Sequence, residues 1–369
     1  MACFVNTRCS LKITHAFVTG ATGFIGTRLT KKLIACGTKV TCLVRQQSNL
    51  QQLENLGCEF AYGDLRDETL SLPGLERCDT LFNVAAMKNA ANPKDMLAIN
   101  PRATRNLLEA VLRSSTPPRV VHVSSLAACG PSTKHRPTVE ADRAAPVSYY
   151  GHSKLESERV VNTYADRLPI SIVRPPIVMG QGDNNGLKMF KLIEQFNYHL
   201  IPGLRNRQYS VIHVDDLVNA LISVAKQGKS IPSSGESDPA ATGIYFASTE
   251  QLSYADLGRK IGLAMGRNRT RCFYVARPIF WSVGAFNSML ARATNRPYLL
   301  NLDKYREVIA GDWTCSSEKL LAETDFDSSV PLVDRLKQTI QWYQENGWLD
   351  RHIQPHAHCL LYTSPSPRD

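Results

Sequence analysis

The sequence predicts an α/β fold of the Rossmann type, a doubly wound parallel sheet joined by a smaller, mainly helical C-terminal lobe. Three observations lead to this prediction. Strand-like and helix-like segments alternate through the first half of the 369-residue chain, a glycine-rich turn follows the first strand directly, and the pattern changes after about Gly180. Alternation of strands and helices is typical of a parallel sheet with helices on both faces.

Short apolar segments predict the strands, and amphipathic segments between them predict the helices. In the first half we expect strands at residues 15–19, 39–44, 59–62, 80–85, 119–124 and 170–173, and helices at 24–36, 102–114 and 153–167. In the second half we expect a strand at 208–213 and helices at 187–196, 215–226 and 254–265. Residues 229–242 are rich in Ser, Pro and Gly, which predicts a mobile surface loop.

The first expected strand is followed by TGATGFIG, in which Gly20, Gly23 and Gly26 are spaced three apart. A strand, a glycine-rich turn and a helix start bring backbone N–H groups and the helix N-terminus beside a diphosphate. Gly20 permits the tight turn, Gly23 lets the backbone approach phosphate, and Gly26 lets the helix pack closely on the strand. We therefore predict that a dinucleotide binds along Gly20, Thr22, Gly23, Phe24, Ile25 and Gly26.

The end of the second expected strand distinguishes the two nicotinamide cofactors. NAD sites commonly carry a carboxylate there for the ribose hydroxyls, whereas an arginine accommodates the 2′-phosphate of NADP. Here the segment VTCLVRQQSN has Arg45 and no acidic residue. A guanidinium pairs well with a phosphate dianion, so the sequence favours NADP(H), with NAD(H) as the alternative. A solvent-facing arginine without a ligand would also explain Arg45.

Tyr150 and Lys154 are four residues apart at the start of an expected helix, so they share one face. Free tyrosine has a pKa of about 10, and a nearby ammonium lowers that pKa by stabilising the phenolate. Tyr150 is thereby predicted to exchange the proton of an alcohol or ketone, and Lys154 to hold the nicotinamide ribose. Tyr149 is a rival for Tyr150 but lacks a lysine at the matching spacing. Ser125, rather than Ser124, is the better candidate to hydrogen-bond the substrate oxygen.

Composition and charge exclude several classes of protein. The formal charge of +10 is scattered, with no basic stripe between aromatic residues, so nucleic-acid binding is not expected. Ten cysteines without a Cys-x-x-Cys pair fit a reducing cytoplasm, and no signal peptide or transmembrane segment is found. Residues 279–290 are apolar and aromatic but too short to cross a bilayer. Three alternatives are predicted for this segment: a core helix, a lid over an apolar substrate or an interfacial helix.

The C-terminal residues 351–369 are expected to be disordered. The last eleven, CLLYTSPSPRD from Cys359, resemble an in-frame translation of a sequencing adapter and are excluded from the fold prediction. Because His352, His356, His358 and Cys359 belong to this tail, we predict no metal site.

From about His15 to Leu349 the chain resembles the extended short-chain dehydrogenase/reductases, the NAD-dependent epimerase/dehydratase family. The residues that carry the resemblance are TGATGFIG, GDLRD at Gly63 to Asp67, NVAA at Asn83 to Ala86, INPRATRNLLEAV at Ile99 to Val111, HVSS at His122 to Ser125, YGHSK at Tyr150 to Lys154, RPP at Arg174 to Pro176 and HVDDL at His213 to Leu217.

This resemblance implies a role for each motif. Asp64 and Leu65 are expected near the adenine, Ala85 and Ala86 beside the cofactor, and Pro175 to Ile177 near the nicotinamide. Ser125 falls at the family's catalytic Ser/Thr position, while Asp215 and Asp216 look like caps of the following helix. The family also implies a homodimer through a helix bundle. We expect residues 12–178 to form the NAD(P)-binding domain, with 208–226 and 243–247 returning to it, and 179–207 and 248–350 to form the substrate lobe.

Departures from the family pattern bear on the substrate. Leu126 and Ala127 stand where sugar-nucleotide dehydratases carry an Asp-Glu pair, which argues against dehydration. Pro175 and Pro176 replace an aromatic residue and an asparagine of many epimerases, and Tyr209 stands in place of their diphosphate-binding arginine, with Arg205 and Arg207 out of register. The chain looks more like the branch with 3β-hydroxysteroid dehydrogenases and dihydroflavonol reductases.

Three functions follow from these observations. The leading hypothesis is an NADP(H)-dependent oxidoreductase that interconverts a ketone and a secondary alcohol on an apolar substrate. The second is a nucleotide-sugar epimerase with tightly held NAD. The third is a cofactor-binding sensor without turnover, against which Ser125, Tyr150 and Lys154 argue.

Overall fold

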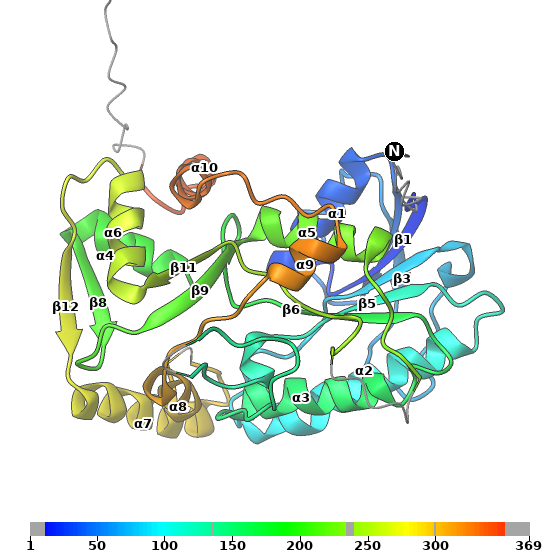
Figure 1. Cartoon of the computed structure of the whole chain (residues 1–369), viewed down its shortest axis with the longest axis horizontal. Coiled ribbons are helices and arrows are strands. Elements are labelled where there is room, and N and C mark those ends of the chain that lie inside the picture. The colour runs from blue at the N-terminus through cyan, green and yellow to red at the C-terminus, as the bar shows by residue number, and fades with distance from the viewer. Residues whose placement is uncertain (1–11, 134–135, 234–239, 299, 351–369) are drawn as a thin grey trace, which may run out of the picture.

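A seven-stranded parallel sheet occupies the larger half of the molecule in this computed structural model, which describes residues 12–133, 136–233, 240–298 and 300–350 (Figure 1). The strand order is β10-β6-β5-β4-β1-β2-β3. Between β1 and β4 the order changes direction, which creates the crevice where doubly wound sheets bind ligands. The predicted fold class is therefore confirmed. The strands are β1 (His15–Thr19), β2 (Lys39–Val44), β3 (Glu59–Tyr62), β4 (Thr80–Asn83), β5 (Arg119–Val123), β6 (Ile170–Arg174) and β10 (Ile244–Phe246).

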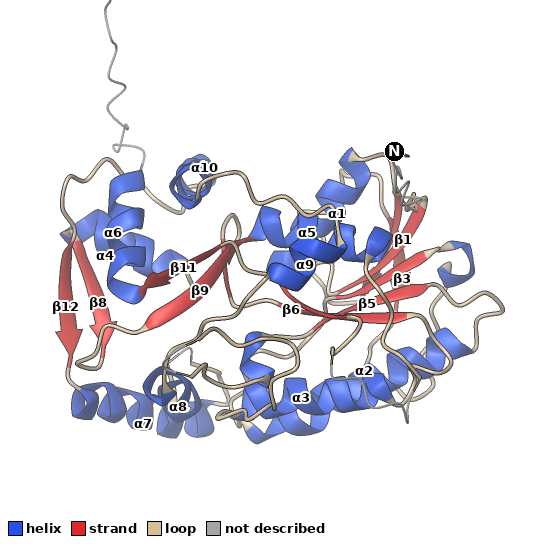
Figure 2. Cartoon of the chain, in the orientation of Figure 1, coloured by secondary structure: helices blue, strands red, loops and turns tan. Residues whose placement is uncertain are grey.

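Helices cover both faces of this sheet (Figure 2). On one face α1 (Phe24–Ala35) packs beside α5 (Val214–Gln227), which also contacts the short α9 (Glu318–Glu323). On the other face α2 (Lys94–Leu112) packs along α3 (Tyr149–Asn162). Buried leucines spaced four apart, such as Leu29 and Leu33 of α1, make these faces apolar. Two single turns of 3₁₀ helix, η1 (Leu75–Arg77) and η2 (Leu126–Ala128), lie in the connections.

The C-terminal lobe combines helices with two small sheets. One sheet has the order β11-β9-β7 and the other pairs β12 with β8. Their strands are β7 (Ile177–Met179), β8 (Tyr198–Pro202), β9 (Gln208–His213), β11 (Glu250–Ser253) and β12 (Arg271–Val275). The helices are α4 (Leu187–Phe196), α6 (Tyr254–Ala264), α7 (Arg277–Thr294), α8 (Leu302–Ala310) and α10 (Leu332–Glu345). Phe190 and Tyr343 meet edge to face in its core, with ring centroids 5.3 Å apart.

The largest difference from the predicted elements is the start of α2. This helix begins at Lys94 and contains Pro101, whereas the sequence predicted a start at residue 102. Proline is a strong helix-breaking signal, and here the surrounding packing overrides it. Helix α3 also begins earlier than predicted, because Ser148 caps it by accepting a hydrogen bond from the Gly151 amide. The short strands β7, β8, β11 and β12 were not predicted.

Segments predicted to return to the nucleotide-binding domain behave in different ways. Strand β10 pairs with β6 of the main sheet, and α5 packs on α1, whereas β9 belongs to the three-stranded sheet. The domain boundaries themselves stay a prediction. Residues 234–239 of the predicted surface loop lie outside the described residues, as does the whole tail from residue 351 with its adapter-like end and its histidines.

Helix α7, which contains the apolar segment 279–290, is not a core helix. Within it only Gly284 and Ala291 are buried, so the core alternative is wrong and the lid and interfacial alternatives remain. In the part of the chain that the structure describes, no helix is long and apolar enough to cross a membrane.

Candidate active site

The predicted site residues gather at one edge of the main sheet. They follow the carboxyl ends of neighbouring parallel strands, where this type of sheet binds ligands. Gly20 follows β1, Arg45 follows β2, Asp64 and Leu65 follow β3, Ala85 and Ala86 follow β4, Ser125 follows β5, and Pro175 and Ile177 follow β6.

The glycine loop is tightly packed at two positions. Gly20 has a φ of +68°, and a Cβ there would lie 2.8 Å from Cα of Ala85. A Cβ on Gly26 would lie 2.1 Å from the carbonyl oxygen of Gly20. A larger residue at Gly26 would push the start of α1 away from the glycine turn. A larger residue at Gly20 would push that turn away from the loop after β4.

The start of α1 suits a diphosphate group. Gly23 is the N-cap residue, no side chain caps the helix, and no acidic residue occurs in its first turn. Its first N–H groups therefore remain for an anionic ligand. Thr22, Gly23 and Phe24 line a cavity of about 320 Å³ together with Gln181, whose buried amide oxygen has no partner. These residues fit a dinucleotide held by its diphosphate.

The ends of β2 and β3 carry the charges expected beside an adenosine ribose. Asp64 forms an ion pair with Arg66 at 2.5 Å, and this hydrogen bond, with the nearby charge of Arg45, holds the pKa of Asp64 below its usual value. Arg45 is exposed and close enough to act on Asp64. Arg66 was not predicted, although it lies within the GDLRD motif.

Tyr150 and Lys154 lie one turn apart on α3, and Ser125 meets Tyr150 from the end of β5. The Ser125 hydroxyl is close enough to the Tyr150 phenol to lower its pKa, and it accepts a hydrogen bond from the Ala127 amide at 3.1 Å. The ammonium of Lys154 is buried and donates to the carbonyl of Val123 at 2.7 Å. The structure thus brings the three predicted catalytic side chains together.

The pKa values of the pair are shifted from those of the free side chains. Desolvation raises the pKa of Tyr150 to about 12, and the nearby Ser125 hydroxyl partly offsets this rise. Burial also lowers the pKa of Lys154 to about 8, against the charge of Glu158. The sequence predicted that Lys154 lowers the pKa of Tyr150, which stays a prediction. In this structure the ammonium donates to the Val123 carbonyl.

Buried polar residues that the sequence analysis did not single out surround the pair. Asn83 links the central strands, because its amide oxygen accepts from Thr19 at 2.8 Å and its nitrogen meets Nδ1 of His122 at 2.9 Å. Asn100 of α2 accepts from the Met87 amide and donates to the Ser153 hydroxyl at 2.9 Å. The available signal for Asn100 was its place in the INPRATRNLLEAV motif.

Helix α8 docks on the N-terminus of the catalytic helix. The Asp303 carboxylate accepts from the backbone amides of Tyr149 at 2.8 Å and Tyr150 at 3.4 Å. Glu307, one turn later, accepts from the Ser148 hydroxyl at 2.6 Å. Negative charge at a helix N-terminus is stabilising, so α8 fixes the turn that carries Tyr150.

Other charged residues of the family motifs have structural partners. His213, not an aspartate, is the N-cap residue of α5, and its ring accepts from the Asp215 amide at 3.2 Å. Asp215 pairs with Arg28 of α1, while Asp216 pairs with Arg335 of α10. The prediction that these aspartates cap the helix is therefore wrong. They lie in the first turn of α5 and connect it to α1 and α10.

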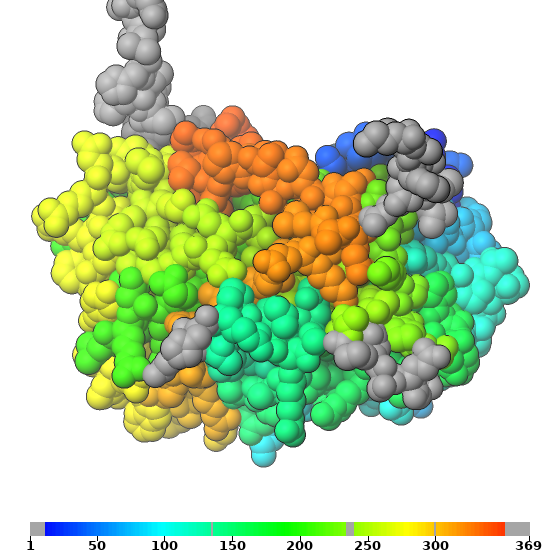
Figure 3. All heavy atoms as spheres, in the orientation of Figure 1, coloured from blue at the N-terminus to red at the C-terminus, as the bar shows by residue number. Residues whose placement is uncertain are grey.

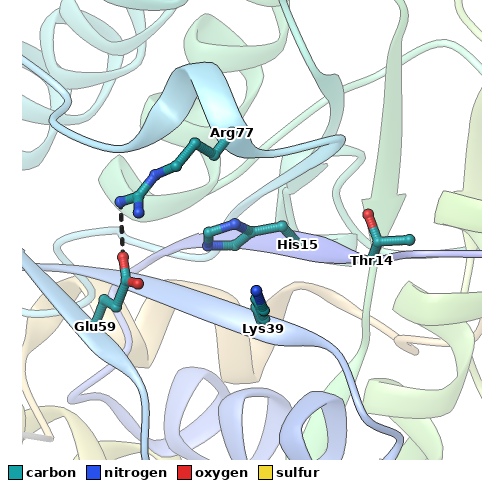
Figure 4. A pocket seen from close by; sticks show the side chains of 5 residues that line it. All are labelled: Thr14, His15, Lys39, Glu59 and Arg77. Atoms are coloured by element: carbon teal, nitrogen blue, oxygen red, sulfur yellow. Dashed lines mark hydrogen bonds and ion pairs between the residues drawn. The ribbon is translucent and has the colours of Figure 1, made fainter.

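A second hollow, of about 330 Å³, lies away from this site (Figure 4). His15, Lys39 and Glu59 are the first residues of β1, β2 and β3, and Thr14 and Arg77 complete its lining. It therefore sits at the amino ends of the strands, opposite the edge where ligands bind. Glu59 pairs with Arg77 at 2.7 Å, and the hollow adds nothing to the site.

Comparison with known proteins identifies the family. A model of the NAD dependent epimerase/dehydratase family matches residues 16–236, more than half of the chain. The chain belongs to this family. Ceramide reductase of Caulobacter vibrioides is 27% identical over 339 residues, covering 91% of this chain and 96% of that protein. Sterol demethylase protein B of Methylococcus capsulatus is 34% identical over 171 residues, covering 45% of this chain and 52% of that protein.

Solved structures support the fold of this epimerase/dehydratase member. UDP-glucose 4-epimerase of Thermotoga maritima aligns with a TM-score of 0.68 at 18% identity, over 90% of this chain and 99% of that chain. The chain is an enzyme, an oxidoreductase of the extended short-chain dehydrogenase/reductase type.

Proposed function

We propose that this enzyme is an NADP(H)-dependent oxidoreductase that reduces a ketone on an apolar substrate, or oxidises the corresponding secondary alcohol. The observation that carries the proposal is the half-buried Tyr150 phenol, which lies near Ser125 and one turn from Lys154 at the edge where the cofactor loop lies. When bound, the nicotinamide supplies or accepts a hydride.

The chain's own residues handle the proton. Tyr150 is neutral near pH 7 because burial raises its pKa to about 12, so it is ready to donate a proton to a carbonyl oxygen as that oxygen gains charge. Ser125 orients the same oxygen through its hydroxyl. Lys154 would hold the ribose of the cofactor, and the backbone N–H groups of the glycine loop would hold the diphosphate.

Several features favour an apolar substrate over a nucleotide sugar. Arg207 does not face a substrate diphosphate, because its guanidinium donates to carbonyls at the end of α8, including that of Ile309 at 2.6 Å. Leu126 and Ala127 offer no acid or base for elimination of water. Among the relatives, ceramide reductase and sterol demethylase protein B carry names that denote lipid substrates. These observations support the steroid-, flavonoid- or lipid-like class.

NADP(H) is proposed over NAD(H) because Arg45 lies at the end of β2 and is exposed. Fluorescence titration of the full chain with NADPH and NADH tests this preference. We expect NADPH to bind about tenfold more tightly, and Arg45→Ala to remove most of that difference. Tighter binding of NADH by the unaltered enzyme would reject the role of Arg45.

The reaction itself is tested by NADPH consumption with a panel of steroid and long-chain aliphatic ketones. Tyr150→Phe should lower turnover about 10²- to 10⁴-fold while cofactor binding is kept. Tyr149→Phe is the matched control, since this neighbouring ring lies against Arg306 rather than Ser125. The alternative, a nucleotide-sugar epimerase, is favoured by the fold likeness to UDP-glucose 4-epimerase. Interconversion of UDP-glucose and UDP-galactose without net cofactor consumption would establish it instead.

A further inference from the structure

Helix α7 presents an apolar stripe to solvent. Ile279, Val283, Phe286 and Leu290 follow the spacing i, i+4, i+7 and i+11, which places them on one face of the helix. Ile279 is 60% exposed and Phe286 59%, and Met289 beside them is 64% exposed. Such a contiguous set of large exposed apolar side chains marks a contact surface.

The opposite side of α7 already has its partner within the chain. Asn287 donates to the Leu300 carbonyl at 2.8 Å, and the Ser288 hydroxyl accepts from the Leu302 amide at 3.0 Å. The Phe280 ring lies against Tyr305 of α8, with centroids 5.9 Å apart. Because α8 covers this side, the stripe faces outward and does not form part of the core.

The sequence segment that contains the stripe carries only positive charges between Asp256 and Asp303. From Leu257 to Leu302 the chain has eight Lys and Arg residues and no Asp or Glu. Five exposed arginines of this segment form no ion pair with any described residue, namely Arg269, Arg271, Arg277, Arg292 and Arg296. Three of these arginines, Arg277, Arg292 and Arg296, lie on α7 or directly after it, whereas Arg269 and Arg271 lie at the far end of β12. Unneutralised arginines beside exposed apolar side chains are the composition of a helix that lies in an anionic membrane interface.

Strands β8 and β12, which lead into α7, add exposed aromatic residues. Leu200 and Phe273 are opposite each other in the pair and are both exposed. The Tyr198 ring contacts those of Phe196 and Phe273, with centroids 6.4 Å and 4.8 Å apart. In the view of Figures 1 and 3 this part of the lobe and α7 form the end of the molecule opposite β3.

We infer that α7 and its flanking arginines form a surface that binds an anionic lipid bilayer. A second copy of the chain fits less well, because a two-fold contact would oppose one positively charged surface to another. A bilayer offers opposite charge to the arginines and an apolar layer to Ile279, Phe286 and Met289. No helix among the described residues could span it, so the contact is peripheral.

The surface is also close in the structure to the catalytic helix. Helix α8 lies against α7 on one side and caps α3 through Asp303 on the other. A protein docked by α7 would therefore hold its active site one helix away from the membrane, where an apolar ketone is dissolved. This part of the inference rests on the proposed function.

Sedimentation of the full chain with vesicles tests the inference. We expect binding to phosphatidylcholine vesicles that contain about 30% phosphatidylglycerol and much weaker binding to phosphatidylcholine alone. The double variant Ile279→Ser, Phe286→Ser should lower the partition coefficient at least about tenfold. Arg292→Gln and Arg296→Gln should each lower it about fivefold, and raised salt should act in the same direction.

Leu321→Ser is the matched control. Leu321 is also an exposed apolar residue, at 50%, but it belongs to α9, which packs by the main sheet and is not part of the α7 surface. This variant should bind vesicles like the unaltered enzyme, and all variants should titrate with NADPH alike, which shows that they are folded.

The outcomes separate this inference from the proposed function. No sedimentation with anionic vesicles, or equal sedimentation of the stripe variants, would overturn the membrane surface even if NADPH-dependent ketone reduction is found. A dimer that the stripe variants dissociate, without vesicle binding, would also overturn it. Vesicle binding lost with the stripe, in an enzyme that reduces no ketone, would uphold the surface and reject the reductase.

Discussion

At the scale of single residues, Lys154 has a protonation state set by its burial. Its side chain is buried, and its pKa falls to about 8 because the charged form loses solvation. A group with a lowered pKa is charged below that value and neutral above it. We expect NADPH affinity to fall as the pH rises through about 8, and Lys154→Met to bind weakly without this dependence. Fluorescence titration across the pH range measures both, and a flat profile for the unaltered enzyme would contradict the assignment.

The ion pair between Arg174 and Glu158 is a second residue-level feature near the site. Both side chains are buried, and the guanidinium donates two hydrogen bonds, at 2.9 Å and 2.6 Å. Loss of one partner leaves a buried charge without compensation, so Glu158→Gln should lower the free energy of unfolding by about 3–5 kcal/mol. Urea denaturation measures this change.

Glu156, also on α3, provides the control for that measurement. It pairs with Arg159 at 2.5 Å, but both side chains are solvent-accessible. Surface pairs contribute at most about 1 kcal/mol, so Glu156→Gln should have little effect. Equal losses in the two variants would mean that burial does not determine the strength of the pair.

At the scale of elements, α8 positions the turn of α3 that carries Tyr150. Asp303 accepts from two amides of that turn, and its charge opposes the positive end of the helix. We expect Asp303→Ala to lower kcat about tenfold through displacement of Tyr150, with a much smaller change in cofactor affinity. Asp303→Asn, which keeps an acceptor, should recover part of the loss.

A control for Asp303 comes from the first turn of another helix. Asp334 of α10 pairs with Lys337 at 3.0 Å on the surface. Asp334→Ala should leave kcat unchanged. If Asp303→Ala instead weakens NADPH binding and kcat to the same degree, α8 would support the cofactor site rather than Tyr150.

The elements also show what the sequence could predict. Strands β1, β2 and β3 have the predicted bounds, because each is a short apolar run bounded by turn residues. The site residues followed from motifs at the strand ends. The start of α2 was missed because Pro101 is a local signal that tertiary packing overrides.

Asp303 and Glu307 lie more than 150 positions from the residues they bind, so no local pattern could reveal them. The raised pKa of Tyr150 depends on burial, which is likewise a property of the folded chain.

At the scale of the whole molecule, buried histidines link stability to pH, and His199 and His213 are two of the four that the described residues contain. His199 and His213 are buried, and burial lowers the pKa of each from 6.5 to about 4. Each ring has a neutral-state partner, the Tyr254 carbonyl at 2.9 Å for His199 and the Thr339 hydroxyl at 3.0 Å for His213. Both therefore remain uncharged in the folded protein through a pH range in which the unfolded chain is protonated.

The sign of the effect follows from these pKa values. Above pH 6.5 neither state binds the proton, so the histidines add no pH dependence. As the pH falls from 6.5 toward 4, only the unfolded chain takes up protons, and stability is lost. We expect a loss of roughly 3 kcal/mol per histidine across this window, measured by urea denaturation at stepped pH. Buried carboxylates such as Asp303, whose pKa is raised by burial, act in the opposite direction, so the comparison is made between variants. His199→Gln and His213→Gln should each reduce the slope of unfolding free energy against pH. The control is His152→Gln, on the exposed side of α3, which should leave that slope unchanged. An unchanged slope in the first two variants would show that acid unfolding begins elsewhere.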